Sequence, residues 1–573
     1  MRFSRSTALS HVGFGVLVAA LVAVAGGAAR LPEAVEQAAR TITADDARAH
    51  LRFLASDELQ GRGTGHTGNQ VAELYLASVF ERVGLERATG VSYLQAVELY
   101  SSTLGAANAL VISEQIHGAA VAARYVPGSD FYPHPASSSR SVAAGLVFAG
   151  YGITAPEYQY DDYAGLDAQG RVVIALDGEP QSDDPQSRFD GRASTPFAGA
   201  DHKIENARRH GAVGLLLVRT RMRDLQAVWP EHPSVRNREF ALALHVDRRM
   251  LPVAMVSLAA ADAAIRSGQR RGEPGAADLR KKIDGALDAA GERVVNAPAS
   301  FAIDGRQITL TTDLARERVV VHNVIGMITG ADPRLKHEIV VIGAHLDHDG
   351  IDGDGRIFNG ADDNASGTVG VLEGAEAFAA AARDGRRPAR TVVFALWNGE
   401  EKGDLGSEYY VEHPVPAGTL VANVNMDMIG RNEEVPDPND FRFRGLKKTS
   451  AAENTNTVHL LGYTYSPELA AIVRQENAAV GLTIKEVLDV HPQNLIRRSD
   501  QWSFLQQRVP AVFLTTGLHP DYHTPQDDIA RINIEKLEKI ARLAFRVAWR
   551  LASDSERPDF TDPRKTVRAT PMN

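Results

Sequence analysis

The spacing of apolar residues near the start of the chain indicates helical structure. Within the stretch 40–120 the apolar positions recur at steps of mostly three or four residues: Val71, Leu74, Tyr75, Val79 and Val83. Gly84 follows them, at the position where a helix C-cap is expected. We expect this stretch to form the first segment of a larger domain.

The pattern changes between about residues 130 and 265, where short apolar runs are separated by turns. The strand-like runs are Gly145–Ala149, Arg171–Leu176 and Ala212–Val218. A helix at Lys203–His210 precedes the last of these runs. This pattern predicts a smaller inserted α/β domain. Its Asp161, Asp162 and Asp167 are interpreted as turn and surface residues, and residues 267–291 as an exposed helix and linker.

From 297 to 555 the pattern is strand, loop and helix in alternation. The strand-like runs are Ile339–Ile342, Thr391–Trp397 and Val421–Met426, and the helix-like runs are Ser366–Arg383 and Ile534–Ser553. Alternation of this kind predicts an α/β fold, in which a mixed, mostly parallel sheet is sandwiched by helices.

The two ends of the chain differ from the rest. Residues 1–29 combine a basic start, an apolar stretch without charge and a run of small residues, as a secretory signal peptide does. An uncleaved anchor helix is the alternative, because Val12–Ala29 is long enough to cross a bilayer. We expect cleavage, a secreted or periplasmic protein, and no membrane contact afterwards. The polar tail 556–573 is expected to be disordered.

Composition narrows the possible partners and ligands. The formal net charge of −10 argues against nucleic acid as a partner. The chain has no cysteine, so any bound metal must be held by histidine and carboxylate side chains.

Histidines and carboxylates follow several of the predicted strands. His345 and Asp347 come directly after the first strand, and further candidates follow at later strand ends: Asp363, Glu400, Glu401, Asp427 and His523. In open α/β sheets, ligands gather at the carboxyl ends of the strands. Two histidines and three carboxylates suit two zinc ions that share a bridging carboxylate and a water molecule.

Two glycine-rich runs have competing interpretations. The run 61–65 lacks the ending of a phosphate-binding loop and follows no strand, so we interpret it as a surface loop. The run 349–355 lacks the final glutamate of a calcium-binding loop, so a flexible turn is the preferred interpretation.

Five motifs together resemble the co-catalytic di-zinc peptidases, a family that includes secreted bacterial leucine aminopeptidases and glutamate carboxypeptidases. They are His345-x-Asp347, Ala361–Gly367, Asn398–Ser407, Asn425–Met428 and Tyr522–Pro525. The segment Ser56–Arg62 also resembles the first segment of that family, and the module at 130–265 resembles its inserted protease-associated domain.

The resemblance implies a role for each matching residue. His345 and Asp427 would hold one zinc ion, Glu401 and His523 the other, and Asp363 would bridge them through a site with a cis bond to Asn364. Asp347 would accept a hydrogen bond from His345 and fix its tautomer.

The resemblance also implies a hydrolytic mechanism. Glu400 would be the general base toward the bridging water, Tyr522 would stabilise the oxyanion, and Arg498 would meet a substrate or product carboxylate. Gln501 departs from the family pattern, which has histidine there, and leaves the details of that pocket open.

The predicted function is therefore that of an exported aminopeptidase acting on peptides. A carboxypeptidase, a glutaminyl cyclase and a non-catalytic receptor on the same scaffold remain alternatives. A receptor would have lost ligands, and none is missing here. The preferred side chain, the oligomeric state and the role of the inserted module stay open.

Overall fold

The computed structural model describes residues 31–561 with short gaps. The longest gaps are 190–194, 267–273 and 286–298, and the others are 117–118, 183, 185–186, 188, 221, 224, 230–233, 237, 490 and 492. The predicted signal segment 1–29 and the end of the predicted tail, 562–573, lie outside the described residues.

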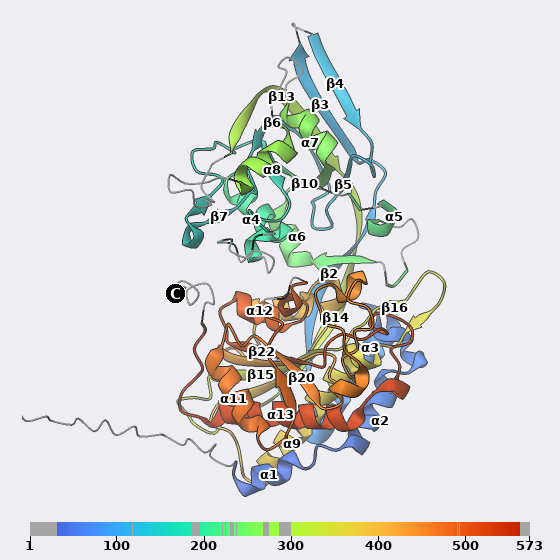
Figure 1. Cartoon of the computed structure of the whole chain (residues 1–573), viewed down its shortest axis with the longest axis vertical. Helices are drawn as coiled ribbons and strands as arrows, with labels where there is room; N and C mark the ends of the chain where they lie inside the picture. The colour runs from blue at the N-terminus through green and yellow to red at the C-terminus, as the bar shows by residue number, and fades with distance from the viewer. Residues whose placement is uncertain are drawn as a thin grey trace, which may run out of the picture.

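A ten-stranded mixed sheet and the helices packed on it form the lower part of the molecule in Figure 1, which we call the lower layer. Its order is β11 (Glu239–Leu242), β2 (Leu94–Leu104), β14 (Leu314–Ile328), β18 (Thr391–Trp397), β15 (Glu338–His345), β19 (Thr419–Met426), β22 (Ala511–Thr515), β20 (Thr457–Leu461) and β21 (Thr483–Lys485), with β1 (Glu86–Arg87) paired to β14. The central strands β18, β15, β19 and β22 are parallel, whereas β14 and β2 are antiparallel to their neighbours. The predicted mixed sheet is confirmed, with three parallel pairings at its centre and a fourth between β20 and β21 at one edge.

Helices cover both faces of this sheet. One face packs against α3 (Thr67–Val83), α9 (Gly367–Arg383), α11 (Pro467–Asn477) and α13 (Ile534–Ser553). The helices α1 (Glu33–Ala39) and α2 (Ala44–Leu54) pack in turn on α9 and α13. The other face packs against α10 (Leu405–Glu412) and α12 (Gln501–Gln506). Every residue of β18 is buried, which explains its uninterrupted apolar sequence.

A second sheet of eight strands and the helices packed on it form the upper part of the molecule in Figure 1, which we call the upper layer. Its order is β4 (Ala119–Tyr125), β3 (Ala109–Ile116), β13 (Phe301–Thr312), β6 (Arg140–Phe148), β9 (Val172–Leu176), β10 (Gly214–Arg219), β12 (Val253–Ser257) and β5 (Phe131–Pro133). This sheet extends beyond the predicted range 130–265 at both ends, because β3, β4 and β13 pair with it.

The helices of the upper layer pack against the same sheet. They are α4 (Ala200–Arg209), α5 (Leu225–Val228), α7 (Leu258–Ile265) and α8 (Ala276–Asp284), whereas α6 (Ala243–Arg249) contacts β2 and β11 of the lower sheet. Helix α8 was expected to be an exposed linker helix. Its Ala276, Leu279 and Ile283 are instead buried in the core of this layer.

Local sequence signals place several elements well. Helix α3 ends at Gly84, which has a left-handed φ of 84°. Its buried face differs from the predicted one, because Val71 and Leu74 are exposed whereas Leu76 and Phe80 are buried.

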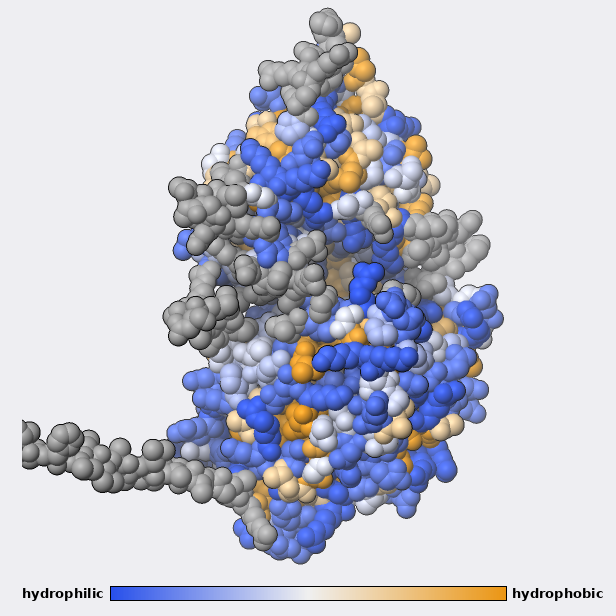
Figure 2. All heavy atoms as spheres, viewed as in Figure 1, coloured by the Kyte–Doolittle hydropathy of each residue, from blue (hydrophilic) through white to orange (hydrophobic). Residues whose placement is uncertain are grey.

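The remaining features of the fold concern its helices, its C-terminal end and its surface. Among the helices that the structure describes, none combines the length and apolar character that a membrane-spanning segment needs. The predicted disordered tail starts too early, because Phe560 packs against Tyr465 at a ring-centroid distance of 6.1 Å and the Thr561 amide donates to the Tyr465 carbonyl. The face seen in Figure 2 is mainly hydrophilic, with small hydrophobic areas.

Glu373 is a buried carboxyl group on α9 that makes stability depend on pH. Its pKa is raised from 4.5 to about 8, mainly by burial and also by the neighbouring carboxylates Glu376, Asp46 and Glu538, against a hydrogen bond from the Thr43 amide that lowers it. The folded chain therefore keeps this proton to about pH 8, whereas the unfolded chain releases it near 4.5. Between these values the free energy of unfolding falls as pH rises.

We expect Glu373→Gln to remove this loss. The variant should match the wild type near pH 5 and exceed its free energy of unfolding at pH 8 by about 1 kcal/mol or more, since one pKa unit corresponds to about 1.4 kcal/mol. Urea unfolding followed by circular dichroism at both pH values measures the difference. An equal difference at pH 5 and pH 8 would show that Glu373 does not titrate in this range.

Candidate functional site

The predicted site residues lie at the carboxyl ends of the four central parallel strands. His345 is the last residue of β15, and Asp427 directly follows β19. Asp363 lies in the short helix η5 (Ala361–Ser366) before α9, Glu400 and Glu401 begin η6 (Glu400–Lys402) after β18, and His523 lies in the loop after β22. Parallel strands end at the same sheet edge, so side chains from distant segments meet there.

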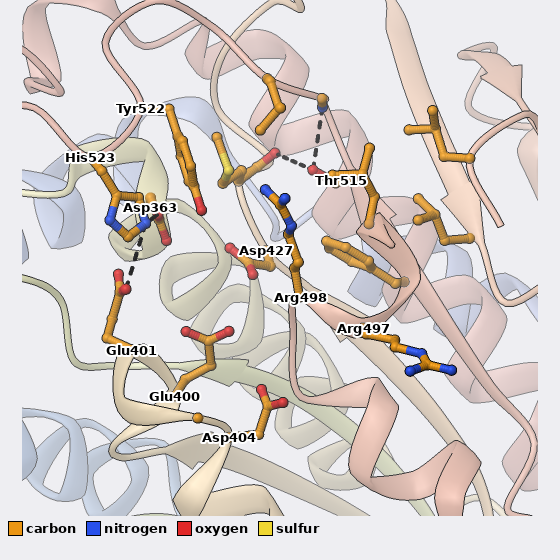
Figure 3. A pocket seen from close by; sticks show the side chains of 18 residues that line it. Asp363, Glu400, Glu401, Asp404, Asp427, Arg497, Arg498, Thr515, Tyr522 and His523 are labelled. Atoms are coloured by element: carbon orange, nitrogen blue, oxygen red, sulfur yellow. Dashed lines mark hydrogen bonds and ion pairs between the residues drawn. The ribbon is translucent and has the colours of Figure 1, made fainter. Parts of the chain in front are cut away.

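Asp363 lies at the centre of this cluster (Figure 3). Its Oδ1 is 3.4 Å from His345 Nε2, which is also 3.4 Å from Asp427 Oδ1. Its Oδ2 is 3.1 Å from His523 Nε2, which is 3.5 Å from Glu401 Oε2. The two oxygens of one carboxylate therefore face two separate pairs, each made of an imidazole and a carboxylate.

The cluster favours positive charge between its carboxylates. Burial alone would raise the pKa of Asp363, but the imidazoles of His345 and His523 lower it well below its usual value. Burial alone would lower the pKa of His345, but Glu400, Asp427 and Asp363 raise it well above the usual value. His345 Nε2 and Asp427 Oδ1 are also buried without a well-formed hydrogen bond among the described residues. A bound cation would supply the missing partner.

Glu400 lies beside this cluster, with Oε2 3.7 Å from His345 Nε2. Burial raises its pKa well above the usual value; His345 opposes the rise, and Asp404, Glu401 and Asp427 add to it. Asp404 was not predicted, although it lies inside the motif that contains both glutamates.

Asp347 makes different contacts from those expected. His345 Nδ1 lies 3.1 Å from the backbone carbonyl oxygen of Asp347 and 3.9 Å from its carboxylate. That carboxylate instead accepts hydrogen bonds from the Glu400 amide, at 3.1 Å, and from the Thr64 hydroxyl, at 2.7 Å. Asp347 therefore holds the loop that carries Glu400, and its main chain orients His345.

Two neighbours of the first motif also belong to the site, and sequence reasoning missed both. His348 is fully buried, and its Nδ1 lies 2.6 Å from Glu401 Oε1. Asp349 lies 3.0 Å from His523 Nδ1 through Oδ2. The sequence pattern favours a flexible turn for the run that begins at Asp349, and only its adjacency to His345-x-Asp347 signals that it belongs to the site.

The glycine-rich run 61–65 is not the surface loop that we expected. Arg62 is 1% exposed and donates hydrogen bonds to the carbonyl groups of Leu54, Leu346, Asn359 and Gly360. Three of these acceptors lie in the loops that carry His345 and Asp363: Leu346, Asn359 and Gly360. Arg62 therefore joins these loops beneath the carboxylates.

Another hydrogen-bond network holds the loop of Asp363 from below. Asp527 Oδ2 accepts hydrogen bonds from the backbone amides of Asp362 and Asp363, each at 3.0 Å. His519 Nε2 lies 3.2 Å from Asp362 Oδ2, and both side chains are fully buried. The peptide bond between Asp363 and Asn364 is cis, as the resemblance implied.

A cavity of about 370 Å³ opens beside the carboxylates. Its walls combine the polar cluster with apolar side chains, among them Leu461, Leu488, Leu495, Phe513 and Leu518. The side chain of Tyr522 points into this cavity, with its hydroxyl beside Asp363 and Asp427 (Figure 3).

The two neighbouring arginines of the cavity wall point in different directions. Arg498 extends into the cavity, whereas Arg497 turns away from the carboxylates (Figure 3) and donates to the carbonyl of Thr195 in the upper layer. Gln501 does not line the cavity: its amide group is buried and donates to the Ile496 carbonyl at 2.6 Å. The departure from the family pattern at Gln501 therefore affects the support of the pocket wall.

Residues 323–548 match the family described as Peptidase family M28. An aminopeptidase of Pseudomonas aeruginosa is 34% identical over 156 residues, 26% of this chain and 26% of the relative. A probable glutamate carboxypeptidase of Arabidopsis thaliana is 26% identical over 420 residues, 69% of this chain and 51% of the relative. These findings confirm the predicted resemblance to a peptidase family. The resemblance of the upper layer to a protease-associated domain stays a prediction.

Coverage differs among the similar proteins. A probable glutamate carboxypeptidase of Arthroderma benhamiae is 32% identical over 168 residues, which span 21% of its own length. The matched segments span 16–26% of the length of the curated relatives that are more than 30% identical to this chain. The solved structure of an aminopeptidase from Aneurinibacillus sp. strain AM-1 has a TM-score of 0.48 at 17% identity, covering 91% of this chain and 97% of that one.

We expect Arg62→Lys to destabilise the chain although it keeps the charge. A lysine has three donors and cannot reproduce the planar fork of arginine, so at least one of the four buried carbonyl groups would lose its partner. The free energy of unfolding should fall by about 1–3 kcal/mol per lost partner. Urea unfolding measures this loss.

Arg52 provides a matched control for this substitution. It is exposed on the neighbouring helix α2, so Arg52→Lys should change the free energy of unfolding by less than about 0.5 kcal/mol. Equal stability of the two lysine variants would contradict the linking role of Arg62.

Proposed function

We propose that this chain, whose segment 323–548 matches Peptidase family M28, is an exported metallopeptidase that holds two zinc ions and releases residues from the amino end of peptides. One observation carries the proposal: the two oxygens of Asp363 face two separate imidazole and carboxylate pairs. This is the arrangement that a carboxylate bridging two cations requires.

The spacing within each pair fits zinc. Ligand atoms about 2.0–2.1 Å from a tetrahedral zinc ion lie about 3.3 Å from one another. The contacts of His345 Nε2 with Asp363 and Asp427 measure 3.4 Å each, and those of His523 Nε2 with Asp363 and Glu401 measure 3.1 and 3.5 Å. His345 and Asp427 would thus hold one ion, Glu401 and His523 the other, with Asp363 shared. The chain has no cysteine, so all of these ligand atoms are nitrogen or oxygen, and zinc binds both.

The chemistry divides between the ions and the protein. Bound zinc ions would supply Lewis acidity, which polarises a peptide carbonyl and makes water easier to deprotonate. Glu400 would accept the proton of the attacking water on its carboxylate and deliver it to the nitrogen of the leaving amine as the carbon–nitrogen bond breaks. Asp347 would keep Glu400 in place, because its carboxylate accepts the Glu400 amide and is fixed in turn by Thr64.

Tyr522 would stabilise the oxyanion that forms on the attacked carbonyl. Burial raises the pKa of its hydroxyl, against the influence of His523, so the group stays protonated and can donate a hydrogen bond. The apolar walls of the cavity would receive a substrate side chain, with Phe513 and Leu518 among the contacts.

The choice of substrate terminus rests on charge. The carboxylates of Glu400, beside the cluster, and of Asp427, within it, both line the cavity, and an α-ammonium group would be favoured next to them. Arg498 extends into the same cavity and is the observation that favours a carboxypeptidase as the second candidate, since it could bind a substrate carboxylate.

We expect Glu400→Gln and Glu401→Gln to separate catalysis from metal binding. Glu400→Gln should retain about two zinc ions per chain and lower kcat by about 10² or more, because a general base is lost. Glu401→Gln should instead lose zinc from one position. Elemental analysis and steady-state kinetics on peptide substrates measure both effects.

The same pair of variants tests the alternatives. His345, Glu400 and Glu401 also lie close enough to share one cation, so equal zinc loss in both variants would make Glu400 a ligand and contradict its role as base. A wild-type protein that binds zinc but cleaves no peptide would favour a non-catalytic receptor.

We expect acetylation of the peptide amino end to reduce kcat/KM at least tenfold. It removes a charge-assisted contact worth about 1.5–3 kcal/mol. Amidation of the carboxyl end of the same peptide is the matched control and should have little effect. If amidation alone abolished cleavage, the result would identify the chain as a carboxypeptidase, with Arg498 as the carboxylate-binding residue.

A further inference from the structure

A segment that is inserted between two strands of the upper layer contacts the loops that carry the candidate metal ligands. After β10 the chain leaves the second sheet, and residues 234–236 pass beside the loop that follows His345 before the chain returns through β11 and α6 to β12. Arg236 of this segment contacts the site through its side chain. It lies 113 positions before Asp349 in the sequence, so only the fold brings them together.

The main chain of this segment is fastened on both sides. The Arg236 amide donates to the Ile351 carbonyl at 3.2 Å, and the Arg236 carbonyl accepts from Lys402 Nζ at 2.8 Å. Ile351 follows the loop of His345, and Lys402 directly follows Glu401. The segment therefore bridges two loops that carry proposed ligands.

The side chain of Val235 fills a gap that only glycines leave open. A Cβ atom on Gly63 would lie 2.2 Å from Val235 Cγ1, and one on Gly350 would lie 2.6 Å from the same atom. Both separations are far below van der Waals contact. This fit fixes the depth at which the segment enters the site.

The guanidinium of Arg236 contacts the side chain that orients His523. Its Nε donates to Asp349 Oδ2 at 2.9 Å, and its Nη2 donates to the main-chain carbonyl of His523 at 3.4 Å. The group also lies over the ring of Phe358, 4.2 Å from the centroid. Asp349 Oδ2 in turn lies 3.0 Å from His523 Nδ1, on the opposite side of the ring from Nε2, which faces Asp363.

We propose that Arg236 is a positioning residue through which the inserted layer sets the zinc affinity of the position that contains His523. By holding Asp349, Arg236 fixes the rotation and the tautomer of His523, so that Nε2 is free of a proton and directed at the metal position. Carboxylates that orient a metal-binding histidine in this way typically change metal affinity by about 10–100-fold when they are removed. The inference rests on the proposed function, because it assumes that His523 binds a metal ion.

The test measures zinc binding itself. Purified full-length protein is stripped of metal and titrated with zinc in competition with a chromophoric chelator, which gives one affinity for each ion. We expect Arg236→Ala to weaken one of the two affinities at least tenfold and to leave the other within about threefold. Raising free zinc should then restore most of the kcat of this variant.

Four further variants, one of them a double variant, separate the orientation of His523 from general packing. Arg238→Ala removes a neighbouring arginine whose recorded ion pair is with Glu317 at 3.9 Å, and it should leave both affinities unchanged. Asp349→Asn should weaken the same ion as Arg236→Ala, and the double variant should be no weaker than the weaker single variant, because both changes break one chain of contacts. Arg236→Lys keeps the charge and should recover part of the affinity. If Arg236→Ala fails to fold, the Asp349→Asn and Arg236→Lys results decide the question.

Different outcomes contradict the two proposals. If the wild type binds two zinc ions and Arg236→Ala binds both with unchanged affinity, the role of Arg236 is wrong and the proposed function stands. Additive losses in the double variant would also overturn it, since they would show that Arg236 and Asp349 act independently. A wild-type chain that binds no zinc would overturn both.

Discussion

The crowding of carboxylates around Asp363 is the constraint on which the rest of the structure depends. Several negative side chains from separate strand ends share one small, largely buried volume, and without positive charge among them this arrangement would cost several kcal/mol. The four parallel strands give these groups a common edge. Imidazoles and a buried arginine supply the compensating charge that belongs to the protein, and the remaining need for positive charge is what makes a pair of divalent cations the natural occupants.

Support for this cluster comes from beneath and from the side. Arg62 joins two of its loops through their carbonyl groups, Asp527 holds the amides on which Asp363 is mounted, and His348 fixes one oxygen of Glu401. Each of these contacts ties down a loop that would otherwise be free to spread under electrostatic repulsion. The residues that face the cavity can therefore keep their positions while substrates enter and leave.

The sequence allowed the order of the strands' polar ends to be predicted, because apolar runs followed by histidine or carboxylate are visible along the chain. It could not reveal supports that lie far away in sequence. Arg62 sits in a glycine-rich run that has the composition of a surface loop, and its burial depends on carbonyl groups about 300 positions downstream. The contacts of Asp347 depended on a backbone turn that residue identity does not encode. The strands β3 and β13 join the upper sheet by long-range pairing, which local patterns along the chain do not show.

The upper and lower layers are connected by paired strands and not by a flexible linker. β2 and β14 are paired without interruption from Leu94 with Val324 to Leu104 with Leu314, and they lead directly toward the upper sheet. A twisted two-stranded ribbon of this length resists bending as a beam does, whereas a glycine-rich linker would behave as a hinge. We therefore expect the upper layer to keep a nearly constant position relative to the lower sheet, so that Val235 and Arg236 stay seated beside Gly350 and Asp349 while substrates bind and leave.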